Sequence, residues 1–155
     1  MNGLRTTIRC VGATLALGAV LGTAASAAQA DGARKQISNS WVDGWVGVSH
    51  RDGMVFAWAN ASSNRNGLAA VMKIRLQHRE CGSSKWTTKA FNPSRGGFTN
   101  VGDEARTSEV RRGGRGLFRA SAVLAHKPRR GAPVDWRKRF QTGAWGDCRP
   151  LPPQP

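Results

Sequence analysis

The feature that most constrains the fold is a run of alternating residues at positions 69–81. Met72, Ile74 and Leu76 share one phase of this run. The other phase is polar and consists of Lys73, Arg75, Gln77 and Arg79. A period of two is typical of a β-strand with one face in the core and the other in solvent. The run is the longest of its kind in the chain, and it predicts a central strand.

Shorter extended runs follow on both sides of this strand. We expect them at 41–49, 54–60, 85–91, 98–102, 107–112, 117–126 and 134–141. Asp52-Gly53 separates the first two runs, and this dipeptide between apolar runs predicts a hairpin. About seven or eight short strands without a convincing helix predict an antiparallel sandwich or barrel. We favour a β-sandwich of the immunoglobulin or fibronectin kind.

The first thirty residues have the order of a secretory signal peptide. Arg5 and Arg9 precede an apolar stretch at 11–22, and small residues follow up to Ala30. This order predicts cleavage after Ala30, with cleavage after Ala27 as the alternative. The apolar stretch is shorter than the roughly 20 residues that a membrane-spanning helix needs. The sequence therefore predicts an exported, extracellular protein.

The exported chain is expected to hold one domain and one disulfide. We expect a flexible segment at 31–40, a domain at 41–148 and a disordered, proline-rich tail at 149–155. Cys10 leaves with the signal peptide, so Cys81 and Cys148 would pair in an oxidising compartment. Cys81 is on the polar phase of its strand, which places the disulfide at the rim and not across the core. No spacing typical of a metal site accompanies either cysteine, and no cofactor is expected.

Three segments carry a resemblance to a known group of proteins. Residues 76–81 read Leu-Gln-His-Arg-Glu-Cys, Lys85-Trp86 follow, and residues 116–120 read Gly-Leu-Phe-Arg-Ala. This pattern resembles small secreted proteins of actinobacteria that have a predicted two-cysteine β-sandwich. The resemblance rests on general patterning over much of the exported chain. It implies export and the sandwich fold, and it implies no activity.

The strongest compositional signal is positive charge. The chain has 24 Lys and Arg against 9 Asp and Glu, a net charge of +15. Arg5 and Arg9 belong to the predicted leader, which leaves +13 for the exported chain. Such a charge favours a polyanionic partner, for example nucleic acid, a wall polymer or an acidic polysaccharide. The alternative is solubility combined with compositional bias, since Arg outnumbers Lys 18 to 6.

Candidate binding residues come from the outer strand faces and from the tryptophans. The candidates are Lys73, Arg75, Arg79, Arg119, Trp41 and Trp45. The first four project from polar strand faces, and the two tryptophans oppose the phase of a valine-rich face. Exposed rings beside arginine can stack on sugars or on bases, the latter at about 1–3 kcal/mol per base. Trp58 and Trp86 are expected in the core, and a merely solvated face is the alternative for the cations.

Two histidines supply the main candidate acid–base pair. His78 and His126 share the inward phase of their strands, so they could approach each other and cleave RNA. The alternative, which we favour, is that they are strand-end histidines without a catalytic role, because no recognised motif contains them.

Three hypotheses therefore stay open at this point. The leading one is a secreted, non-enzymatic, monomeric protein that binds an anionic polymer or an envelope surface. The second is a small secreted nuclease that uses His78 and His126. The third is a protein-interaction or inhibitor module that uses the loop at 62–67 or the loop at 92–97.

Overall fold

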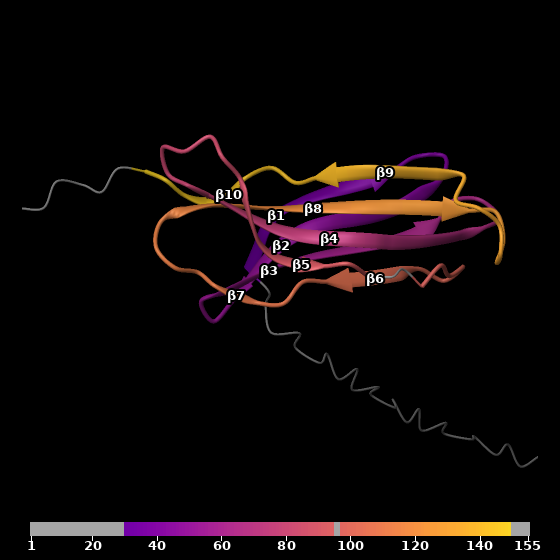
Figure 1. Ribbon diagram of the computed structural model, residues 1–155, viewed down its shortest axis with the longest axis horizontal. Helices are drawn as coiled ribbons and strands as arrows, with labels where there is room; N and C mark the ends of the chain where they lie inside the picture. The colour runs from indigo at the N-terminus through magenta and orange to yellow at the C-terminus, as the bar shows by residue number, and fades with distance from the viewer. Residues whose placement is uncertain (1–29, 95–96, 150–155) are drawn as a thin grey trace, which may run out of the picture.

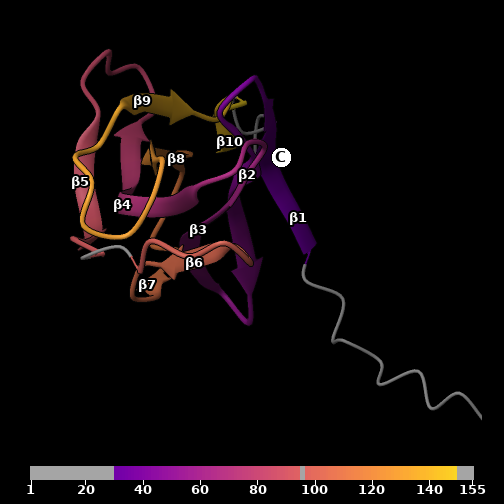
Figure 2. The same ribbon diagram turned by 90° about the vertical axis from the view of Figure 1, so that its right-hand side faces the viewer.

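The computed structural model describes residues 30–94 and 97–149. The predicted signal peptide and most of the predicted tail, residues 150–155, lie outside the described residues. Within the described ranges the chain forms strands and turns and no helix. Figure 1 shows the strands running roughly along the long axis of the molecule, and the turned view in Figure 2 shows them in two layers.

The described residues form ten strands. In chain order they are β1 (Ala30–Ser38), β2 (Val42–Arg51), β3 (Met54–Ser63), β4 (Leu68–Glu80), β5 (Thr87–Asn92), β6 (Asp103–Arg106), β7 (Val110–Arg111), β8 (Gly116–Lys127), β9 (Trp136–Gln141) and β10 (Trp145–Asp147). The first sheet, called sheet A here, has the order β1-β2-β3-β6, with β7 also paired to β3. Sheet B has the order β10-β8-β4-β5, with β9 also paired to β8. All pairings are antiparallel, so the predicted all-β architecture with two antiparallel sheets is confirmed.

The core lies between the two sheets and is built from small and β-branched side chains. Sheet A contributes Val46, Val48 and Val55, and sheet B contributes Ile74 and Leu76, all at most 1% exposed. The strand predicted at 69–81 is therefore central, as its alternation indicated. Burying such side chains is worth about 1.5–3 kcal/mol each before entropy is subtracted.

A β-bulge changes the phase of β4 at Met72. The pairing of β4 with β8 shifts between Val71 and Lys73, so Ala69 and Val71 face the core before the bulge, and Ile74 faces it after the bulge. Met72, which the alternation assigned to the core, is partly exposed. The extra residue of a bulge is what produces such a change of phase.

The prediction of a flexible segment at 31–40 is wrong. Residues up to Ser38 form β1, which pairs with β2 along the edge of sheet A. Ile37 of this strand is 4% exposed and belongs to the core. The segment lacks alternation because most of its residues lie on an edge strand that is open to solvent. The strand predicted at 98–102 is also wrong, since only an isolated bridge joins Thr99 to Ala69 there.

The predicted disulfide between Cys81 and Cys148 is present. It joins the residue after β4 to the residue after β10 across a separation of 67 residues, and Cys81 is exposed at the rim. A loop of that length corresponds to about 4 kcal/mol of denatured-state entropy in the loop-closure model. The bond therefore fixes the C-terminal strand to the middle of sheet B.

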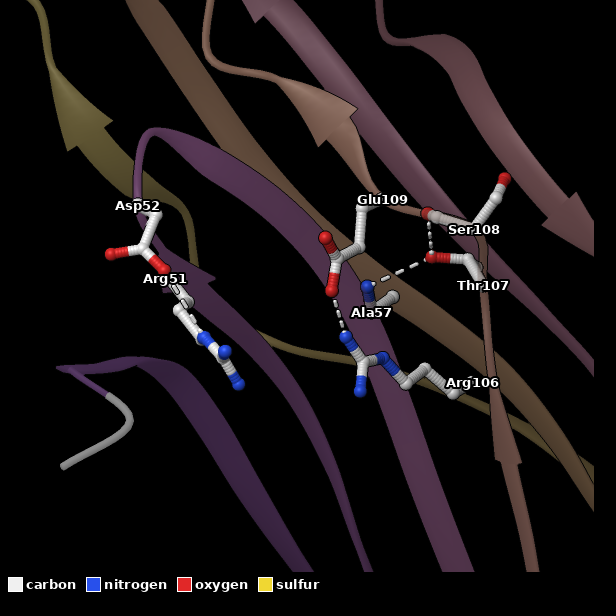
Figure 3. A network of polar contacts seen from close by, with 7 residues as sticks. All are labelled: Arg51, Asp52, Ala57, Arg106, Thr107, Ser108 and Glu109. Carbon is white, nitrogen blue, oxygen red and sulfur yellow. Dashed lines mark hydrogen bonds and ion pairs between the residues drawn. The ribbon is translucent and has the colours of Figure 1, made fainter. Parts of the chain in front are cut away.

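Two threonines continue the hydrogen bonding of the edge strands where those strands are interrupted. Between β6 and β7, Thr107 donates its N–H to Ala57 O (2.9 Å). Its Oγ1 accepts the Ala57 N–H (3.0 Å), as Figure 3 shows. Between β9 and β10, Thr142 makes the same two bonds to Ala120, at 3.0 and 3.1 Å. Each hydroxyl also donates to the carbonyl of the next residue. In each sheet, a threonine hydroxyl oxygen thus replaces a backbone carbonyl as the acceptor at the interruption between two edge strands.

Replacing Thr142 by valine keeps the shape of the side chain and removes the acceptor for the Ala120 N–H. We expect the free energy of unfolding to fall by about 1–3 kcal/mol, the cost of a buried donor without a partner. Thr142→Ser keeps the hydroxyl and loses one methyl group, about 0.8 kcal/mol. Urea unfolding of the wild type and the two variants measures whether stability decreases in the order threonine, serine, valine at position 142. A valine variant as stable as the serine variant would contradict the prediction.

Candidate functional site: a cationic face on sheet B

The register of sheet B brings the predicted cations onto one face. Residues that are directly opposite in antiparallel strands project to the same side. Lys73 is opposite Val123, which is opposite Arg139, and Arg75 is opposite Ser121. One step further, Gln77 is opposite Arg119, and Arg79 follows on β4. We call the set Lys73, Arg75, Arg79, Arg119 and Arg139 the cationic face.

Arg139 was not among the candidate binding residues. Its segment was expected to form a strand at 134–141, but only the pairing of β9 with β8 shows that Arg139 lies beside Val123. The alternation of β9, in which Trp136 and Phe140 pack on the core, was the available signal for the opposite orientation of Arg139.

Aromatic rings hold three of the cations in place. The guanidinium of Arg75 lies 5.1 Å from the ring centre of Phe91. Those of Arg79 and Arg119 lie 5.1 and 4.2 Å from the ring centre of Trp86. Cation–π contacts of this kind contribute about 0.5–1 kcal/mol each at exposed sites. Trp86 is therefore not the core residue that its alternation predicted, because it lies partly exposed under two arginines of the cationic face.

The cationic face contains no balancing carboxylate. The outer phases of β4 and β8 and the exposed odd positions of β9 hold no Asp or Glu. The ion pairs Arg51–Asp52 and Arg106–Glu109, and the contact of His126 with Asp135, include none of these cations. Burial lowers the pKa of the Arg119 guanidinium, and the nearby charge of Arg79 lowers it further.

A side-chain hydrogen bond orients Arg119 within this face. Its Nε donates to Oε1 of Gln77 at 2.9 Å, and its cross-strand position fixes the direction of the side chain. The remaining guanidinium nitrogens of Arg119 can therefore donate to a ligand that approaches from solvent.

Trp41 and Trp45 do not belong to the cationic face. Trp41 packs against the core, with its ring centre 5.4 Å from that of His126 and 4.3 Å from the guanidinium of Arg65. Trp45 lies on the outer face of sheet A, 5.4 Å from the guanidinium of Arg34. The six predicted binding residues are thus divided over separate parts of the molecule.

The structure does not bring His78 and His126 together. His78 is opposite Phe118, whereas His126 is opposite Ala69, nine residues earlier on β4. At about 3.3 Å per residue the two histidines are roughly 30 Å apart, at opposite ends of the same ladder. Each is buried, and the Nε2 atom of each has no hydrogen-bond partner among the described residues. The expectation that they could approach each other is wrong.

Neither the third histidine of the chain, His50, nor the two candidate loops form an assembled catalytic or metal site within the described residues. His50 stacks on Trp145, with ring centres 4.8 Å apart. Within the described residues, no group of three or more His, Cys, Asp and Glu side chains could hold a metal ion. The loop at 62–67 borders a shallow, arginine-rich hollow, and the loop at 92–97 includes two residues outside the described ranges.

Comparisons with known proteins add no assignment. No protein-family model matches the chain, and no curated protein and no solved structure matches it either. In the part of the chain that the structure describes, no helix has the length and apolarity needed to cross a membrane. The geometry of the surface is therefore the basis for any functional assignment.

Burial of His78 makes stability depend on pH. Burial, together with the charge of Lys89, lowers the pKa of His78 below its ordinary value of about 6.5, and Glu80 opposes this weakly. As pH falls below about 6.5, His78 becomes protonated in the unfolded chain before it does so in the folded protein. The free energy of unfolding therefore falls. We expect His78→Gln to lose less stability than the wild type between pH 7 and pH 5.

Urea midpoints of both proteins at the two pH values measure this difference. The comparison uses the change in stability between the two pH values. A destabilisation by glutamine that is the same at both pH values therefore does not affect it. Equal losses in the two proteins would contradict the assignment to His78.

Proposed function

We propose that the protein is a secreted, non-enzymatic module that binds an anionic polymer through the cationic face. The observation that carries this proposal is the gathering of five cations, without a carboxylate in the same phase, on the outer side of one sheet. The partner would be an extended polyanion such as a wall polymer, an acidic polysaccharide or a nucleic acid.

Like charges held close together support an anionic ligand. Arg79 and Arg119 both lie against Trp86, and the pKa of Arg119 is lowered partly by the charge of Arg79. This repulsion opposes folding in the free protein, and a bound anion would relieve it. Because the rings and Gln77 already hold the side chains, little side-chain entropy would be lost on binding.

The shape of the face favours a polymer over a small anion. Lys73, Arg75 and Arg79 follow one strand at multiples of two residues, a repeat of about 6.8 Å. Arg119 and Arg139 extend this row across β8 and β9. A flat row of cations matches a chain of regularly spaced negative charges better than it encloses a single ion.

The disulfide supports the extracellular part of the proposal. A disulfide such as Cys81–Cys148 persists in oxidising compartments and is rare in the cytosol. An exported protein that meets anionic polymers at or near the cell envelope is consistent with this bond and with the predicted signal peptide.

We also propose that the sandwich is of the immunoglobulin or fibronectin kind. With β1 set aside, sheet A has β2, β3 and the β6–β7 pair in the positions of strands A, B and E. Sheet B has the β9–β10 pair, β8, β4 and β5 in the positions of strands G, F, C and C′. The extra strand β1 and a disulfide at the rim distinguish the protein from antibody domains.

The test removes the two stacked arginines. Arg79→Ala with Arg119→Ala should weaken binding to a fluorescent 20-nucleotide oligothymidylate and reduce the slope of log K against log salt by about 1.4, since each lost single-strand contact contributes about 0.7. The same variant should leave heparin at lower salt.

The matched control is Arg51→Ala with Arg111→Ala, which removes the same charge from exposed positions near the β2–β3 turn and β7 of sheet A. If both variants weaken binding equally, net charge alone explains the affinity and the cationic face is not the site. Repeating the titration with polyglycerol phosphate and with heparin distinguishes the classes of polymer.

A further inference from the structure

The outer face of sheet A, opposite to the cationic face, carries two ordered rows of side chains. The first row across β1, β2, β3 and β6 is Gln36, Trp45, Asn60 and Glu104. The second row is Arg34, Gly47, Trp58 and Arg106. Each row thus places one tryptophan among planar polar side chains.

Trp58 is held flat on the sheet by its partner glycine. A Cβ atom on Gly47 would lie 2.5–2.7 Å from three ring atoms of Trp58, so the ring packs face-on against the glycine backbone. The indole Nε1 donates to Oγ of Ser49 at 2.9 Å, which fixes the ring in this orientation. The ring is partly exposed on the outer side of sheet A.

Trp45 is the diagonal neighbour of Trp58 and is also partly exposed. Diagonal side chains on antiparallel strands are about 7–8 Å apart. The Arg34 guanidinium lies 5.4 Å from the Trp45 ring centre, so a planar cationic group already stacks beside this ring. Asn60 is opposite Trp45, and its Oδ1 accepts the Trp45 backbone N–H at 2.8 Å, so its amide is fixed in place.

Two shallow hollows follow the two rows. One, of about 350 Å³, is lined by Trp58 and Arg106, and the other, of about 390 Å³, is lined by Trp45 and Asp43. Asn60 and Glu104 line both hollows and form the boundary between them. Arg106 is kept in position by its stacking on Phe56, 3.6 Å from the ring centre, and by its ion pair with Glu109 (Figure 3).

We propose that this face binds a neutral oligosaccharide, with one sugar ring on Trp58 and another on Trp45. The apolar C–H face of a pyranose covers an indole ring, and the hydroxyls around its rim pair with planar amide, carboxylate and guanidinium groups. Small-molecule sites usually combine aromatic surface with a few polar groups placed around it.

The charges on this face select against a polyanion. Glu104 and Asp43 line the hollows together with Arg106, so the two signs are mixed. A polyanion would meet carboxylates here, whereas the cationic face has none in its outer phases. Because the two faces lie on opposite sides of the sandwich, one molecule can bind a neutral glycan and a polyanion at the same time.

The experiment measures binding of cellohexaose, xylohexaose, maltohexaose and chitohexaose by isothermal titration calorimetry. We expect a Kd of about 1 mM or tighter for at least one of them. Trp58→Ala should weaken that binding by about tenfold or more, and Glu104→Gln by about threefold or more. Raising the salt from 50 to 500 mM should leave it unchanged, since no counterions are released.

Trp86→Ala is the matched control, because it removes a partly exposed tryptophan from the cationic face. It should bind the glycan as the wild type does. Glu104 is exposed, so Glu104→Gln keeps the test decisive if Trp58→Ala does not fold.

Three results would overturn the inference. They are a wild type that binds none of the four glycans, glycan affinity that is equal in the wild type and in Glu104→Gln and Trp58→Ala, and affinity lost in Trp86→Ala. A wild-type dimer in sedimentation that Trp58→Ala converts to a monomer would identify the face as a self-association surface. None of these results bears on polyanion binding by the cationic face.

Discussion

The pairing of β4 with β8 is the interaction on which the other parts of the molecule depend. The ladder runs from Leu68 opposite Lys127 to Glu80 opposite Gly116, the full length of both strands. Its inner side contributes Ile74, Leu76 and Leu124 to the core. Its outer side contributes four of the five residues of the cationic face. A change in the register of this one pair by a single residue would exchange the two sides.

Glycines at both ends of this ladder make room for the buried histidines. A Cβ on Gly116 would lie 2.1 Å from Nε2 of His78, and one on Gly67 would lie 2.3 Å from Nε2 of His126. The histidines are therefore packing residues whose Nε2 atoms face glycine backbone, and Nδ1 of His126 lies 2.9 Å from Oδ1 of Asp135. This arrangement explains why they are buried without forming a catalytic pair, and why the protonation of His78 costs stability.

Much of the fold follows from local pattern, because a period of two and a turn dipeptide are properties of short segments. The central position of residues 69–81 and the hairpin at Asp52-Gly53 were predictable for that reason. The pairing of the two cysteines was predictable as well, since only Cys81 and Cys148 lie outside the predicted leader. The strand at Ala30–Ser38 was not, because its stability comes from pairing with β2 and from the burial of Ile37.

The candidate site was predictable in part. The phase of β4 indicated Lys73, Arg75 and Arg79, and the phase of β8 indicated Arg119. The phase of β2 indicated the outer position of Trp45, opposite to that of the valines. The sides of Trp58 and Trp86 were not predictable, because alternation alone does not reveal which phase of a strand faces the other sheet. Their positions depend on cross-strand partners, such as Gly47 under Trp58, that are distant in sequence.

The rim disulfide has a mechanical consequence. β10 is only three residues long, so tension on the chain beyond Cys148 would peel it from β8 one hydrogen-bonded pair at a time. The Cys81–Cys148 bond carries that tension past β10 and into the end of β4. There the load acts along a strand paired on both edges, with β5 and with β8, so that rupture requires many bonds to shear together. A protein held by a polymer on its sheet B face would therefore resist pulling from its C-terminal side.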